Sequence, residues 1–255
     1  MYKLSRLISE STTMFSRCLR ISLRNPEIFA TSIFVPAAVM WLFGAVFGNI
    51  MDVGNYSYID FIVPGIILQT VGQGAMATAV SVNNDMNKGI IDRFRSMPIS
   101  KSAVLSGHVL AAVTRTVITT LVTLVVALAI GFRPQAGILD WLVISGVLVL
   151  YMLVVAWISV ICGLVAKTPE SAGTMPILLF ILPYLSSGFV PIEALSGWLR
   201  VFAANQPMTP IIDTLRGLMV NMPANGALPL ALAWCVGIIV VAFVVALQVY
   251  KRKLG

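Results

Sequence analysis

Residues that could carry out chemistry are scarce in this sequence and do not form the sets that catalysis needs. The chain has one histidine, His108, and three cysteines, Cys18, Cys162 and Cys235. Because the cysteines are far apart, they have neither the spacing of a metal site nor that of a disulfide framework, and we interpret them as small apolar packing residues. A single histidine excludes the H-E-x-x-H zinc motif. We therefore expect no catalytic residues and no metal site.

The sequence lacks the residues that ion coupling within the membrane or ATP binding by a phosphate loop would need. None of the ten acidic residues lies at the centre of an apolar stretch, which is where ion-coupled carriers usually bind their coupling ion. The sequence has no G-x-x-x-x-G-K-[ST] phosphate loop, so the chain cannot hold ATP in that way. We interpret the glycines of VGQGAM (71–76) as small residues for close helix packing. Energy for any work on the membrane would have to come from another chain.

The densest group of charges lies in the stretch NNDMNKGIIDRFRSMPISKSAVL. Asp85 comes early, where an acid complements the dipole of a short helix, and Pro98 ends the helix that this pattern predicts. Phe94 lies between Arg93 and Arg95, so the helix offers an aromatic side chain flanked by positive charge. Such a helix suits docking into a groove of a soluble partner. It equally suits a loop that only fixes the membrane topology.

These residues belong to a chain that is too apolar for a soluble globular domain. Of the 255 residues, 58% are hydrophobic and 11% are charged, with a mean hydropathy of +0.94, whereas a soluble domain is about 25% charged. Apolar stretches of the ~20 residues needed to cross a bilayer recur along the chain. Pro176 and Pro183 interrupt one of them, which membrane helices tolerate when neighbours satisfy the freed carbonyls. We predict an all-α integral membrane protein with six transmembrane helices, at 28–49, 61–82, 110–131, 139–165, 174–190 and 227–249.

The basic residues indicate how the chain is oriented in the membrane. Most of the 17 lysine and arginine residues fall in the N-terminal segment, in the loops after the second and fourth spans, and in the C-terminal tail. By the positive-inside rule, both termini are cytoplasmic. The net charge of +7 then reflects topology, and we expect no binding of nucleic acid. Arg115 lies near a membrane boundary and either snorkels to the inner interface or faces the bundle interior.

Two segments outside the spans have helical patterns of their own. Residues 1–25 alternate basic and apolar positions with a helical period, which predicts an amphipathic helix in the cytoplasmic interface. This helix either only anchors the chain or also touches a cytoplasmic partner. Between the fifth and sixth spans, residues 191–226 contain two short helical pieces, about 194–204 and 209–220, separated by prolines. We expect an external re-entrant hairpin, with a plain amphipathic surface loop as the alternative.

The run GIIDRFRSMPISKSAVLSGHVL resembles the cytoplasmic signature of membrane subunits of type-2 ATP-binding-cassette (ABC) exporters, specifically the daunorubicin-resistance-like permeases. In that family a G-x-x-D-R-F-R-S-[LM]-P-I run lies between spans two and three. The segment LSSGFVPIEALSGWLRVFAANQPMTPIIDTLRGL (185–218) is similar to a second family segment, and GFRP (131–134) is a weaker match. His108 stands where the family often has arginine, and Gln206 where asparagine is common. The resemblance covers essentially the whole chain as a single permease domain (1–255).

The resemblance implies a membrane-spanning subunit of an ATP-driven exporter in a bacterial cytoplasmic (inner) membrane. A separate ABC ATPase subunit would bind ATP and Mg²⁺, and this chain would bind no cofactor itself. A second permease, identical or related, would complete the translocation path within the membrane lipid. A cytoplasmic coupling helix at 84–101 would transmit the movement of the ATPase, through Asp85, Gly89, Asp92, Arg93, Phe94, Arg95 and Pro98.

On the same resemblance, the cargo path would be lined by the first, second and fifth spans. An apolar and aromatic lining without fixed charge favours a hydrophobic or amphiphilic cargo, drug-like or lipid; any lipid-facing helix has a similar composition. Two alternatives stay open, an ion-coupled secondary transporter or channel and a membrane scaffold that transports nothing. The expected path residues are Phe34, Met40, Phe43, Gln69, Gln73, Phe180 and Tyr184, and the hairpin would form an outer gate with Phe189, Pro191, Trp198 and Arg216.

Overall fold

The computed structural model describes residues 26–48, 50–51, 53–54, 56–87, 101–224 and 226–254. Within these ranges the ordered elements are all helical. The interfacial helix predicted at 1–25 and most of the predicted coupling helix lie outside the described residues. The elements are α2 (Pro26–Phe47), α3 (Tyr58–Asn87), α5 (Lys101–Ile130), α6 (Ile138–Val165), α7 (Pro169–Thr174), α8 (Ile177–Ile181), η1 (Leu182–Leu185), η2 (Ile192–Ala194), α9 (Gly197–Asn205), α10 (Met208–Val220) and α11 (Ala227–Leu254).

Four helices are long and apolar enough to cross a membrane, and they correspond to the second, third, fourth and sixth predicted spans. They are Tyr58–Asn87, Leu105–Ile130, Ile138–Val165 and Ala227–Arg252. The first predicted span is found as α2, of which the apolar part Phe34–Phe47 is shorter. The described part of the chain is therefore an all-helical, multi-pass membrane protein.

The fifth predicted span, 174–190, is not one helix. It is divided into α7, α8 and η1, and the divisions fall at prolines. Pro176 immediately precedes α8, and Pro183 lies in η1. Each proline removes a backbone N–H donor and weakens the helical ladder at this point, although α2 and α3 continue through Pro36 and Pro64. Gln206, which follows α9, donates from Nε2 to the carbonyl oxygens of Leu182 and Leu185, at 3.3 and 2.5 Å.

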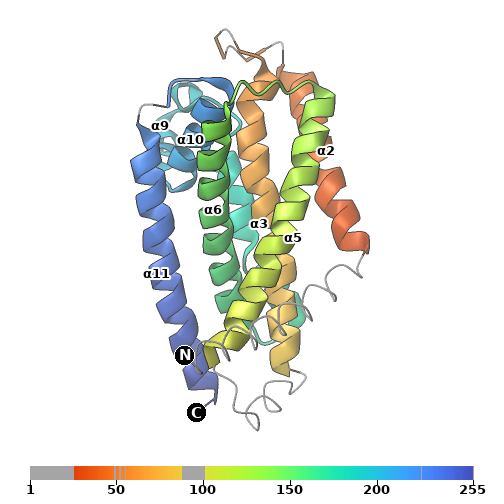
Figure 1. Ribbon diagram of the computed structural model, residues 1–255, viewed down its shortest axis with the longest axis vertical. Helices are drawn as coiled ribbons and strands as arrows, with labels where there is room; N and C mark the ends of the chain where they lie inside the picture. The colour runs from red at the N-terminus through yellow and green to blue at the C-terminus, as the bar shows by residue number, and fades with distance from the viewer. Residues whose placement is uncertain are drawn as a thin grey trace.

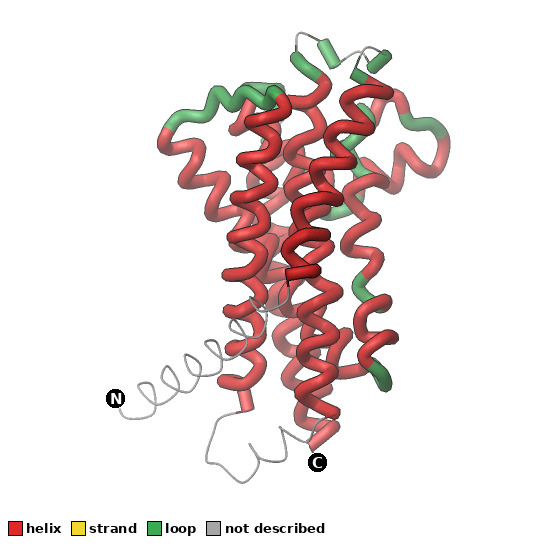
Figure 2. The backbone as a smooth tube through the Cα atoms, turned by 90° about the vertical axis from the view of Figure 1, so that its right-hand side faces the viewer, coloured by secondary structure: helices red, strands yellow, loops and turns green. Residues whose placement is uncertain are grey.

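Helix α3 lies at the centre of the bundle. It packs against α2, α5, α6 and the broken segment α7–η1, and 78% of its apolar stretch is buried, against 22% in α11. Figure 1 shows the long helices running along the length of the molecule, with α11 at one edge and α2 at the other. Helices α9 and α10 lie at one end, and the C-terminus lies at the opposite end. Figure 2 shows most loops gathered at the two ends of the bundle.

Glycines allow the broken segment to lie directly on α3. A Cβ at Gly65 would lie 2.7 Å from the carbonyl oxygen of Gly188, and one at Gly72 would overlap the carbonyl oxygen of Leu179. These two glycines are seven residues apart, which is about two helical turns, so they share one face of α3. The interpretation of VGQGAM as a close-packing sequence is confirmed at Gly72.

Candidate functional site

An aromatic cluster forms where α2 meets α8, η1 and the residues that follow η1. The rings of Tyr184 and Phe189 stack with their centroids 4.4 Å apart. Phe43 of α2 packs on both of them, at 5.1 Å from Phe189 and 6.4 Å from Tyr184, and Phe180 contacts Tyr184 at 6.0 Å. Aromatic pairs at these separations each add about 0.5–1.5 kcal/mol beyond burial. The structure thus brings together three predicted path residues and one predicted gate residue.

Amide groups of α3 lie beside this cluster. Gln69 is buried and donates from Nε2 to the hydroxyl of Tyr184 at 2.5 Å. The Oε1 atoms of Gln69 and Gln73 are buried and have no hydrogen-bond partner within the described residues. A buried amide oxygen without a donor is costly, by about 1–3 kcal/mol. The site therefore has aromatic faces next to unfilled acceptors, which suits a molecule with an apolar body and a polar group.

The other predicted path and gate residues lie elsewhere. Phe34 is 74% exposed on the outside of α2, and Met40 is fully buried in the hydrophobic core. Trp198 is 76% exposed on α9, and no ring contact joins it to the aromatic cluster. Pro191 immediately precedes η2 and lines a cavity at the hairpin end.

Arg216 of α10 ties the hairpin to the bundle. It is buried, and its Nε donates to the carbonyl oxygen of Phe61 at 3.1 Å, while Nη2 donates to the carbonyl oxygen of Ser187. Nη1 donates to Asp213 at 3.0 Å, and the guanidinium carbon lies 3.8 Å above the centre of the Phe61 ring. Asp213 also accepts from the Ser187 hydroxyl at 2.7 Å. One side chain thus joins α3, α10 and the segment that carries Phe189.

Burial opposes both charges of this network. It lowers the pKa of Arg216 to about 10, although Asp213 acts in the opposite direction. It also raises the pKa of Asp213, partly offset by Arg216 and by the Ser187 hydroxyl. A cavity of about 240 Å³ lies over the network, and Glu193 contributes a second carboxylate to its wall. The ion pair lies within α10, so the contacts that hold the hairpin to the bundle are those of Arg216 with the carbonyl oxygens of Phe61 and Ser187.

A row of polar contacts joins α3 to α5, which we call the α3–α5 polar seam. At the C-terminal end of α3, Asp85 Oδ2 lies 3.3 Å from Nε2 of His108. Seven residues further into the bundle on each helix, Arg115 Nη2 donates to the Thr78 hydroxyl at 2.6 Å, and also to the carbonyl oxygen of Gly74. Arg115 is 4% exposed, so it faces the interior and does not snorkel. The seam ends at the hydroxyl groups of Thr70 in α3 and Thr123 in α5, which lie 3.5 Å apart.

Asp85 lies in the last turn of α3 and not in the first turn of a separate helix, where the sequence pattern had placed it. The helix continues through Asn87 because α3 is held against the end of α6. Asn83 donates from Nδ2 to the carbonyl oxygens of Gly163 and Ala166, at 3.1 and 2.8 Å. The remaining coupling residues, Gly89, Asp92, Arg93, Phe94, Arg95 and Pro98, lie outside the described residues.

Sequence reasoning missed the partners that make these sites. The Gln69 amide and the Tyr184 hydroxyl are 115 residues apart, and nothing in either local pattern links them. The Asp213–Arg216 pair does have a signal, because residues three apart on a helix share a face. Arg115 also had a signal in the sequence, because an ionisable residue in an apolar helix needs a partner.

Comparison with known proteins gives one family and several relatives. Residues 10–220 match the family described as ABC-2 type transporter. The chain is 29% identical over 247 residues to the daunorubicin resistance ABC transporter permease protein DrrB1 of Streptomyces coeruleorubidus, covering 96% of this chain and 87% of the relative. It is 29% identical over 227 residues to the probable doxorubicin resistance ABC transporter permease protein DrrC of Mycobacterium tuberculosis, covering 87% and 80%. It is 26% identical over 200 residues to the inner membrane transport permease YadH of Escherichia coli K12, covering 76% and 77%.

Proposed function

The chain belongs to the ABC-2 type transporter family, and on that premise we propose that it exports a hydrophobic or amphiphilic cargo, drug-like or lipid, as the membrane subunit of an ATP-driven exporter. The cargo would leave the cytoplasm or the inner leaflet. The observation that carries this proposal is the family match together with relatives whose names state daunorubicin or doxorubicin resistance. The permease would work with a separate ABC ATPase, which would bind ATP and Mg²⁺.

The cargo path in this proposal runs along the aromatic cluster. Phe43, Phe180 and Tyr184 would offer flat apolar faces, and the unpartnered amide oxygens of Gln69 and Gln73 would accept hydrogen bonds from polar groups of the cargo. This combination supports an amphiphilic cargo over a purely apolar one, because each amide oxygen gains a donor only when the cargo carries one.

Phe189 would be the central residue of the outer gate. It is 1% exposed and stacked on Tyr184, and its carbonyl oxygen accepts from the Tyr58 hydroxyl at 2.9 Å. Arg216 donates from Nη2 to the carbonyl oxygen of Ser187, which is two residues before Phe189. Opening would therefore move Phe189 together with α10, which supports a gate that responds to the hairpin. Pro191 and Trp198 would lie at the outer rim.

Coupling in this proposal starts in the segment between α3 and α5. The ATPase would bind Phe94 and the flanking Arg93 and Arg95, and Pro98 would end the docking helix. The α3–α5 polar seam supports this route, because Asp85 and His108 join the two helices that flank the segment. Movement of the docking helix would then displace α3 and α5 together.

The complete permease in this proposal has six spans, with α2 and the broken segment 174–190 as the first and fifth. Both termini would be cytoplasmic, residues 1–25 would form an interfacial helix, and residues 191–226 would form a re-entrant external hairpin in a bacterial inner membrane. Two permeases, identical or related, would be needed for one path.

Transport in vesicles tests the proposal. The chain and its partner ATPase are reconstituted in inside-out proteoliposomes, with doxorubicin fluorescence as the probe. We expect ATP-dependent accumulation that Phe43→Ala lowers severalfold. Trp41→Ala, which removes a 70% exposed aromatic side chain from the same helix, is the matched control and should transport normally. Uptake driven by an ion gradient without ATPase would instead indicate a secondary carrier, and an ATPase that never responds to any cargo would indicate a scaffold.

A further inference from the structure

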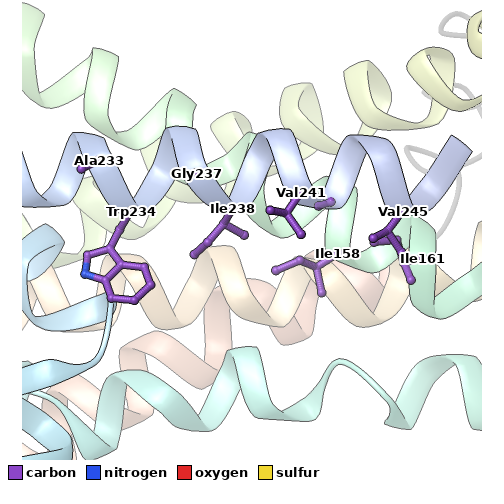
Figure 3. A pocket seen from close by; sticks show the side chains of 9 residues that line it. Ile158, Ile161, Ala233, Trp234, Gly237, Ile238, Val241 and Val245 are labelled. Atoms are coloured by element: carbon purple, nitrogen blue, oxygen red, sulfur yellow. The ribbon is translucent and has the colours of Figure 1, made fainter. Parts of the chain in front are cut away.

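An apolar groove of about 550 Å³ runs between α6 and α11. Trp234, Ile238, Val241 and Val245 lie along one side of α11, with Ile158 and Ile161 of α6 beside them (Figure 3). The four α11 positions follow the spacing of one helix face. Two of these side chains remain open to the surroundings, because Trp234 is 38% exposed and Val241 is 62% exposed. The groove is thus a surface feature of two membrane-spanning helices.

Gly237 leaves the groove open. A Cβ built on Gly237 would meet no heavy atom within 4 Å, in contrast to Gly72 of α3. The glycine is therefore not there to let another described helix approach, and helix propensity disfavours it by about 1 kcal/mol relative to alanine. The space beside it is available to a molecule from outside the described chain.

Positive charge lies beyond the same end of both groove walls. Lys167 follows Ile161 by six residues, and Lys251 follows Val245 by six residues, with Arg252 next to it. In α11 six helical residues correspond to about 9 Å, whereas Lys167 lies two residues beyond the end of α6. All three basic side chains are exposed. Glu170, three residues after Lys167, is the acidic residue nearest to these basic residues in the sequence.

We propose that the α6–α11 groove binds one acyl chain of an anionic phospholipid, with the phosphate held by Lys167, Lys251 and Arg252. Trp234 and Val245 are eleven residues apart, so the groove is about 16 Å long. This is close to half of the ~30 Å hydrocarbon core, which is the depth that one leaflet fills. Basic residues next to a membrane surface attract anionic headgroups.

This lipid is not the exported cargo. Figure 1 places α11 and α2 at opposite edges of the bundle, and the aromatic cluster includes Phe43 of α2. The bound lipid instead fixes α11, which is the least buried of the four spanning helices, against α6. The proposal rests on the membrane location of these helices and does not depend on the proposed cargo or on the partner ATPase.

Quenching of Trp234 by brominated lipid tests this site. In a variant with Trp41, Trp141, Trp157 and Trp198 replaced by Phe, the protein is placed in nanodiscs containing phosphatidylglycerol or phosphatidylcholine with brominated acyl chains. At equal mole fraction, phosphatidylglycerol should occupy the groove about fivefold more than phosphatidylcholine for each basic residue that contacts it. Replacing Lys167, Lys251 and Arg252 with Gln should remove this preference.

A second test compares a substitution that fills the groove with one that places the same side chain elsewhere on α6. Gly237→Leu should abolish the phosphatidylglycerol preference, whereas Gly146→Leu, on an exposed and equally open position of α6, should retain it. Native mass spectrometry of the same two substitutions in the otherwise unchanged chain gives a second readout, as retained phosphatidylglycerol after delipidation. Equal quenching by the two lipids, or equal retention by the two variants, would overturn the proposal. Loss of a dimer in Gly237→Leu, without loss of lipid, would assign the groove to a second copy.

Discussion

Arg216 shows how one residue can set the position of a whole loop. Its guanidinium group reaches two backbone carbonyls, one carboxylate and one ring, on three separate parts of the chain. Arginine suits this position because its planar group carries five donors in a fixed geometry. A lysine would supply one point charge and could not contact all of these groups together. At this end of the bundle, one side chain therefore joins α3, α10 and the segment before Phe189.

The raised pKa of Asp213 gives the network a defined pH dependence. A carboxyl group whose pKa is raised by burial binds a proton more readily in the folded protein than in the unfolded chain. Its contribution to the free energy of unfolding therefore increases as the pH falls through its folded pKa toward the unfolded value of about 4. Asp213→Asn lacks this titration.

Thermal unfolding in detergent between pH 7 and pH 4 measures the effect. The stability of the wild type relative to Asp213→Asn should increase as the pH is lowered. Parallel curves would show that the partners of the carboxylate balance the effect of burial, and a relative loss of stability in acid would show that they outweigh it; either result would contradict the prediction.

At the scale of elements, the contact between α3 and the broken segment depends on the absence of side chains. Gly72→Ala would place a Cβ against the backbone carbonyl of Leu179, which cannot move without displacing α8. Overpacking of this kind costs about 1–3 kcal/mol, so we expect a lower unfolding temperature. Gly146→Ala meets open space on α6 and should be neutral or slightly stabilising. Equal unfolding temperatures for the two variants would contradict the close packing.

The α3–α5 polar seam supports a second prediction, about coupling. Asp85→Asn removes the charge that faces His108, which weakens the α3–α5 contact nearest to the segment between the two helices. We expect the amount of cargo moved per ATP hydrolysed to fall severalfold while the ATPase still binds. His108→Arg places a permanent positive charge opposite Asp85 and should preserve coupling. Loss of coupling in both variants would mean that the imidazole itself is required.

The elements that could be predicted from the sequence are those that depend on local pattern. Apolar runs predicted the helices that became α3, α5, α6 and α11, whereas 174–190 was predicted as one span and is divided near Pro176 and Pro183. The end of α3 could not be placed, since Asn83 is held by carbonyls of α6 that are 80 and 83 residues away. For the same reason the contact between Gln69 and Tyr184, and that between Arg216 and Phe61, had no sequence signal.

For the whole molecule, the central position of α3 has a mechanical consequence. It contacts α2, α5, α6, α10 and the broken segment, so a displacement of α3 would also displace these elements. Its two ends connect the proposed docking segment at one end of the bundle with Phe61 and the Arg216 network at the other. An ATPase that moves this helix would thereby reach the proposed outer gate through a single rigid element.

Loss of the docking contact should therefore stop transport without unfolding the permease. Phe94→Ala and Arg93→Glu are expected to reduce co-purification of the partner ATPase severalfold. Phe202→Ala removes an exposed aromatic side chain from α9, near the opposite end, and serves as the control. Normal ATPase binding and ATP-stimulated transport in both docking variants would refute the assignment of this segment.

The hydrogen bonds of Gln206 also bear on how the protein is made. The carbonyls of Leu182 and Leu185 depend on an amide that is synthesised more than twenty residues later. During translation, the 174–190 segment would leave the insertion machinery before its backbone is satisfied, so it cannot settle in lipid by itself. Its final placement must wait for the hairpin to emerge and fold back. Nascent chains that end before residue 206 should therefore hold this segment less firmly in the bilayer than chains that extend beyond it.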